Sequence, residues 1–139
     1  MPARDVYGIR VADSARGYKS LGKAGDITRA QHCRAEFYAQ GIGWIPVDPA
    51  DVRKVILEEP PGKLAIDNAV VVSARKALFG AWEMNWLAYN FGHDIRLPGS
   101  EGPEAPFLMY PQLETSAGRA DSLDAASFVY AITSKEVTA

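Results

Sequence analysis

The stretch from His32 to Pro49 reads HCRAEFYAQGIGWIPVDP and decides the fold that we predict for the chain. Residues Gln31 to Tyr38 favour a strand, Gly41 to Gly43 supply a turn, and Trp44 to Val47 favour a second strand. Two such segments joined by a short Gly-containing turn pair in the antiparallel sense. We therefore expect a β-hairpin here.

A histidine and an aspartate lie at the same end of this predicted hairpin. His32 is at the beginning of the first strand, and Asp48 follows the second strand sixteen positions later. A carboxylate in that place can accept a hydrogen bond from the imidazole, which orients the ring, selects its tautomer and stabilises the imidazolium. Two of the three groups of a nucleophile, base and orienter triad are thus predicted.

The same stretch resembles the transglutaminase-like superfamily, whose core carries a segment of the type H-x-W-x-E-x-Y-x-x-G-x-G-W-x-P-x-D-P. The match includes the His, the Glu four residues on, an aromatic, the Gly-x-Gly-Trp turn and the closing Asp-Pro. Arg34 departs from the pattern, because the family commonly has Trp there. The resemblance implies that His32 is the general acid/base and Asp48 its orienting carboxylate, in a module acting on amide bonds of peptides or proteins.

The nucleophile that the resemblance implies is not evident in the chain. In this family a cysteine thiolate at the N-terminus of a helix before the sheet attacks the amide carbonyl, and an amine or water resolves the thioester. Here that helix would precede Met1, and Cys33 is no simple substitute because adjacent strand residues point to opposite faces. We therefore expect residues 1–139 to be one transglutaminase-like domain, N-terminally truncated and inactive as given. The alternative is a non-catalytic scaffold or binding domain that has lost its nucleophile.

The rest of the chain predicts an α+β fold, an antiparallel sheet with one or two helices. Asp48 and Pro49 open a helix that ends before Pro60, and Asp67 opens a second that Gly80 ends. Further expected strands are Val6–Ala12, Trp86–Tyr89, Phe107–Tyr110 and Phe128–Ile132, and Asp13–Gly25 is expected to be a surface loop.

The charge composition argues against two classes of binding partner. Fifteen basic and 17 acidic residues without a long single-sign block argue against nucleic acid and an anionic membrane. No apolar run is long enough for a membrane helix, so we expect a soluble protein, with the cytoplasm favoured. If the cysteine helix is missing, the sheet face that it would cover should expose apolar side chains, and we expect a homo-oligomer or a complementing segment.

The remaining candidates favour structural roles. Glu36 is expected to form a cross-strand ion pair, and Cys33 to be a small buried residue. Adjacent His93 and Asp94 rarely chelate together, so no metal and no cofactor is predicted. The aromatic residues Trp82, Trp86, Tyr89 and Phe91 are expected to fill a core rather than line a groove.

Overall fold

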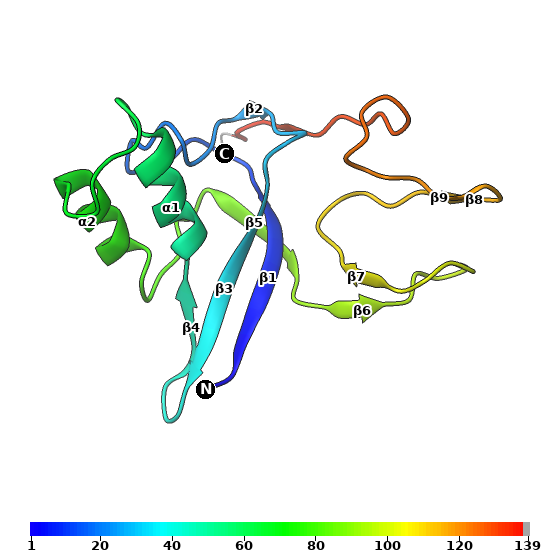
Figure 1. Ribbon diagram of the computed structural model, residues 1–139, viewed down its shortest axis with the longest axis horizontal. Helices are drawn as coiled ribbons and strands as arrows, with labels where there is room; N and C mark the ends of the chain where they lie inside the picture. The colour runs from blue at the N-terminus through cyan, green and yellow to red at the C-terminus, as the bar shows by residue number, and fades with distance from the viewer. Residues whose placement is uncertain (138–139) are drawn as a thin grey trace.

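A four-stranded antiparallel sheet is the centre of the molecule, with two helices on one side and two hairpins on the other (Figure 1). The computed structural model describes residues 1–137. This is the α+β fold that the sequence predicts. The strand order is β4-β3-β1-β5, with β1 at Ala3–Arg10, β3 at Gln31–Ala39, β4 at Gly43–Val47 and β5 at Trp86–Asn90.

Helix α1 (Pro49–Glu58) begins where the sequence places it. The Asp48 side chain accepts a hydrogen bond from the Asp51 backbone N–H at 2.8 Å, and Pro49 takes the first helical position, where its missing N–H costs nothing. Helix α2 (Ala69–Ala77) begins one residue later than predicted, because Asn68 rather than Asp67 caps it by accepting from the Val70 N–H at 2.9 Å.

The two helices share a small apolar core that also takes in the preceding loop. Leu21, which the sequence placed in a surface loop, is fully buried in this core. The loop is held next to Leu21, because the Ser20 backbone N–H and hydroxyl both donate to Glu59 at 2.7 Å. The prediction of a surface loop is therefore wrong at Leu21. The buried core residues are Leu21, Val55, Val71, Ala74 and Leu78.

The C-terminal third carries the remaining small strand pairs. In Figure 1 the hairpins β6–β7 and β8–β9 extend from the sheet on the side opposite the helices, and β10 pairs with β2. The bounds are β6 at His93–Ile95, β7 at Ala105–Phe107, β8 at Glu114–Thr115, β9 at Gly118–Arg119, β2 at Gly25–Asp26 and β10 at Thr133–Ser134.

Two of the predicted strands are wrong in whole or in part. Strand β7 ends at Phe107, and residues 128–132 form no strand. The Ile132 carbonyl accepts from the Ile27 backbone N–H, but the Ile132 N–H donates to the Thr28 hydroxyl. One of its two backbone groups is therefore bonded to a side chain and not to a neighbouring strand. Aromatic and β-branched residues favour strands only where a neighbouring strand is there to pair with them.

The register of the sheet decides which side chains share a face. His32 pairs with Gly8 and Arg34 with Val6, whereas Cys33 pairs with Tyr7 between them. Because side chains alternate along a strand, His32 and Arg34 project from one face and Cys33 from the other.

Gly8 leaves room for the Trp86 ring. A side chain at this position would meet the Trp86 ring at 2.5 Å and would also clash with the Leu87 carbonyl oxygen.

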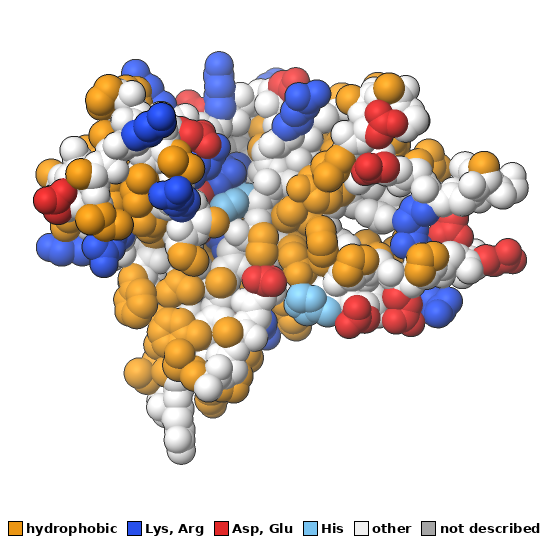
Figure 2. All heavy atoms as spheres, viewed as in Figure 1, with side chains coloured by type: hydrophobic (Ala, Val, Ile, Leu, Met, Phe, Trp, Pro, Cys, Tyr) orange, Lys and Arg blue, Asp and Glu red, His pale blue; other side chains and the backbone are white. Residues whose placement is uncertain are grey.

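The surface carries no large block of one charge on the face in view. Figure 2 shows acidic and basic side chains interspersed there, and apolar ones gathered around the β3–β4 end of the sheet. Among residues 1–137, no helix has the length and apolar character needed to cross a membrane.

Candidate active site

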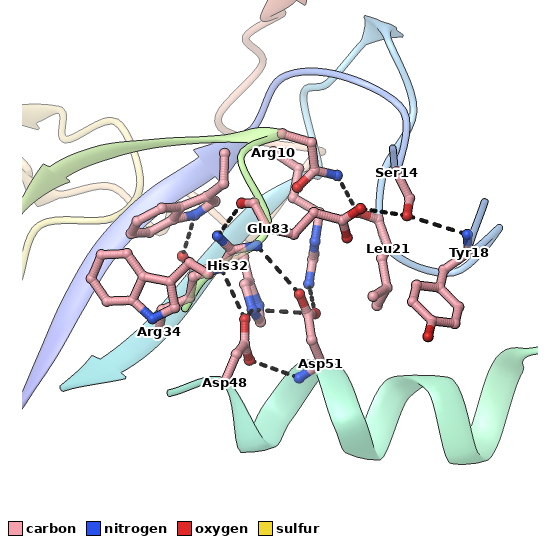
Figure 3. Close-up of polar contacts among 12 residues, drawn as sticks. Arg10, Ser14, Tyr18, Leu21, His32, Arg34, Asp48, Asp51 and Glu83 are labelled. Atoms are coloured by element: carbon pink, nitrogen blue, oxygen red, sulfur yellow. Dashed lines mark hydrogen bonds and ion pairs between the residues drawn. The ribbon is translucent and has the colours of Figure 1, made fainter. Parts of the chain in front are cut away.

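His32 and Asp48 meet where strand β3 begins and helix α1 starts. The His32 Nε2 atom lies 3.0 Å from Asp48 Oδ2, so the hydrogen bond expected from the hairpin is present. The other oxygen of Asp48 caps helix α1. One carboxylate therefore fixes the helix start and orients the imidazole at the same time. Figure 3 shows its side chain pointing from the start of α1 toward the sheet residues.

Asp51 is a second carboxylate against the same imidazole nitrogen. Its Oδ1 atom lies 3.3 Å from His32 Nε2, and it forms an ion pair with Arg10 at the end of β1. Its side chain is completely buried. Sequence reasoning missed Asp51. Its position three residues after Asp48 was the available signal, because residues i and i+3 are neighbours on the surface of a helix.

Arg34 is a buried cation between the two carboxylates. Its Nε lies 2.9 Å from Asp48 Oδ2, an ion pair whose N–H is not aligned as a hydrogen bond, and its Nη2 lies 3.5 Å from Asp51 Oδ2. Its Nη1 donates to the Glu83 carbonyl oxygen at 2.6 Å, and its guanidinium lies 4.7 Å from the centre of the Trp86 ring. Arg34 thus contacts both carboxylates, the Glu83 backbone and Trp86.

The electrostatics of the cluster separate the two carboxylates. Burial opposes ionisation of Asp48, but the His32 hydrogen bond and charge and the Asp51 backbone N–H outweigh it and lower the Asp48 pKa below its usual value. Burial and the neighbouring Asp48 charge raise the Asp51 pKa. Burial lowers the pKa of Arg34, which still stays charged at neutral pH. Two guanidiniums, Arg10 and Arg34, face two carboxylates.

Two tryptophans form a wall beside the cluster. The Trp86 indole N–H donates to the His32 carbonyl at 3.1 Å, and the Trp82 N–H donates to the Val47 carbonyl at 3.2 Å. Their rings meet edge to face at 5.3 Å. They therefore hold the backbone on both sides of the His32 and Asp48 pair. Of the four aromatics expected in a core, only Trp86 is fully buried, Trp82 is partly buried, and Tyr89 and Phe91 are exposed.

Cys33 is unsuited to serve as the nucleophile. It lies on the opposite sheet face from His32, and its Sγ is 3.5 Å from the Arg34 carbonyl oxygen. Burial, together with the negative charge of Asp5, raises the Cys33 pKa to about 11. A thiol with this pKa is almost entirely protonated at neutral pH and is a poor nucleophile. Cys33 is only partly buried, less than the sequence suggested.

The other candidates take structural places. Glu36 accepts a hydrogen bond from Arg4 at 2.8 Å as the expected cross-strand ion pair. His93 is exposed, with Nδ1 3.5 Å from the Tyr7 hydroxyl.

One cluster has the composition of a metal site. Within residues 1–137, His32, Asp48 and Asp51 are the group of potential ligands found together, with ligand atoms all within 4.8 Å. The carboxylates already face two guanidiniums, which a divalent cation would have to displace. The arrangement fits an ion-pair network better than a metal centre.

An apolar hollow of about 660 Å³ opens next to Asp48. His32 is not part of its lining, so the hollow does not lead to the imidazole. The lining residues are Met1, Phe37, Val47, Asp48, Pro49, Val52, Arg75, Leu78 and Phe79.

Fold and site together define an α+β protein with a buried imidazole, two carboxylates and two guanidiniums at the junction of sheet and helix. Among curated proteins, an uncharacterized protein of Haemophilus influenzae is 36% identical over 147 residues. The alignment covers 99% of this chain and 39% of that protein, so the chain spans about two-fifths of its relative's length. No protein-family model matches the chain, and no solved structure matches it.

Proposed function

We propose that the chain supplies the general base and the orienting carboxylate of a transglutaminase-like cysteine acyl transferase or peptidase acting on peptide amide bonds. His32 is the base and Asp48 the orienter, and the thiolate comes from another segment or another chain. The observation that carries the proposal is the 3.0 Å contact between His32 Nε2 and Asp48 Oδ2 at the end of the paired strands.

The free side of the imidazole supports this assignment. Within residues 1–137, His32 Nδ1 has no hydrogen-bond partner, whereas Nε2 lies between two carboxylates. The His32 side chain keeps 11% of its surface exposed, so the ring is not sealed. A base held through one nitrogen and open at the other is what proton transfer from a thiol requires.

The second candidate is a non-catalytic scaffold that keeps the hairpin and its ion pairs. It is favoured by the state of Cys33, whose pKa of about 11 and position on the far sheet face leave the chain without a reactive thiol of its own. Under this alternative the buried cluster serves only to join helix α1 to the sheet.

Activity-based labelling separates the two candidates. The protein in its natural assembly is treated with a peptidyl acyloxymethyl ketone, which alkylates a cysteine activated by a nearby base. We expect rapid labelling at a cysteine other than Cys33. His32→Ala and Asp48→Asn should slow it by about 10²- to 10⁴-fold, the range for loss of a positioned general base or its orienter.

The chain offers matched controls for this experiment. His93→Ala removes the other histidine, which is exposed and far from Asp48 in the sequence, and should leave labelling unchanged. Cys33→Ser should likewise have no effect. Labelling that is absent, or that is equally fast in His32→Ala, would favour the scaffold and reject the catalytic proposal.

A further inference from the structure

We infer that Asp51 is a positioning residue whose negative charge next to His32 Nε2 acts together with the Asp48 hydrogen bond, so that the ring is held as the Nε2–H tautomer with its Nδ1 lone pair free. The catalytic meaning of this inference rests on the proposed function above. The tautomer itself is a property of the chain and can be measured without any activity.

The geometry places two carboxylates next to one imidazole nitrogen. His32 Nε2 lies 3.0 Å from Asp48 Oδ2 and 3.3 Å from Asp51 Oδ1, and both carboxylates are completely buried. Carboxylates that have lost their protons can only accept hydrogen bonds. A nitrogen placed between two of them must therefore carry the hydrogen, which leaves the proton-free position to Nδ1.

Asp51 is held in place from three directions. Its backbone N–H donates to Asp48 at 2.8 Å, its Oδ1 pairs with Arg10, and its Oδ2 lies 3.5 Å from Arg34 Nη2. Arg10 lies on strand β1 and Arg34 on strand β3, so the Asp51 side chain is held from two strands, while Asp48 holds its backbone. A side chain fixed in this way can orient the imidazole with little conformational freedom left to lose.

The charge count gives Asp51 a second effect on His32. With both carboxylates ionised, the charges of Arg10 and Arg34 are balanced, and the imidazole takes up a proton in a neutral surrounding. Without the Asp51 charge the two guanidiniums would face one carboxylate, and a positive imidazolium would form next to an excess positive charge. Asp51 therefore favours the protonated base that proton abstraction creates.

A purely structural role makes a different prediction. If Asp51 served only to neutralise Arg10 and Arg34, its removal would lower the stability of the fold. The tautomer ratio of His32 would then be set by Asp48 alone and would not change. The ring nitrogens of His32 report directly on this difference, since protonated and unprotonated imidazole nitrogens have well-separated ¹⁵N shifts.

The experiment is a long-range ¹H–¹⁵N correlation of the ¹⁵N-labelled chain at neutral pH, with His93 as the internal exposed reference. In the native protein we expect His32 to be overwhelmingly the Nε2–H tautomer. In Asp51→Asn the preference should fall by about tenfold, because the negative charge that favours a hydrogen on Nε2 is lost. Glu59→Gln is the matched control, because Glu59 is a buried carboxyl next to the other end of α1 and bonds to Ser20. It should leave the ratio unchanged.

A second variant covers the case in which Asp51→Asn fails to fold. In Asp48→Asn the Asp51 carboxylate is the remaining negative charge next to Nε2, so His32 should stay mainly the Nε2–H tautomer. An Nδ1–H tautomer in the native chain, an unchanged ratio in a folded Asp51→Asn, or loss of the Nε2–H preference in Asp48→Asn overturns the inference. None of these results depends on the activity-based probe, so the inference and the proposed function can fail separately.

Discussion

Arg34 Nε lies 2.9 Å from the same Asp48 oxygen that receives the His32 hydrogen bond. The orienting carboxylate is therefore shared between a base and a buried cation. Because the Arg34 side chain is completely buried and reaches both carboxylates and the Glu83 carbonyl, it is the central charge of the junction between sheet and helix α1.

Removal of Arg34 should be strongly destabilising. Arg34→Met keeps much of the apolar volume but leaves two buried carboxylates facing one guanidinium, and loss of one partner of a buried ion pair costs about 3–5 kcal/mol of unfolding free energy. Urea denaturation measures the loss. Arg96→Met is the control, because Arg96 and Glu104 form an exposed pair at 3.5 Å and should change stability by less than about 1 kcal/mol. Equal effects of the two substitutions would mean that the Arg34 contacts contribute little.

Gly8→Ala should disturb the tryptophan wall. A methyl group at Gly8 meets the Trp86 ring at 2.5 Å, and Trp86 holds the His32 carbonyl. Overpacking of this kind costs about 1–3 kcal/mol. We expect lower urea resistance together with a shifted tryptophan emission. At Gly92 the nearest atom to the added methyl, at 2.8 Å, is the end of the flexible Ile95 side chain, so Gly92→Ala should have the smaller effect. The reverse order would contradict the close contact at Gly8.

Cys33 should react slowly with thiol reagents in the folded chain. With a pKa of about 11, the thiolate is about a thousandth of the thiol at pH 8. Iodoacetamide labelling followed by mass spectrometry should therefore be far slower in buffer than in urea, and His32→Ala should not change the rate. Rapid labelling that depends on His32 would restore Cys33 as a candidate nucleophile.

The sequence predicted the hairpin, both helices and the contact of His32 with Asp48, because each of these depends on local patterns and on one turn. It did not predict Asp51 as part of the site, because its role depends on how helix α1 is placed against strands β1 and β3. The sequence did not predict the role of Arg10 either, because Arg10 and Asp51 are 41 residues apart in the sequence and meet only in the folded chain. Leu21 was missed because its loop shows no periodic apolar pattern, although packing buries it completely.

The two carboxylates should respond to pH in opposite directions. Asp48 has a folded pKa below its usual value of 3.8, so its charge stabilises the fold above that pH, and the benefit is lost as pH falls through the folded pKa. Asp51 has a raised folded pKa, so its contribution is favourable below 3.8 and is lost as pH rises through the raised value. In urea denaturation between about pH 7 and pH 3, the stability gap between native chain and Asp48→Asn should narrow as pH falls. The gap to Asp51→Asn should widen. Parallel changes in the two variants would show that the pKa values of Asp48 and Asp51 are not shifted in opposite directions.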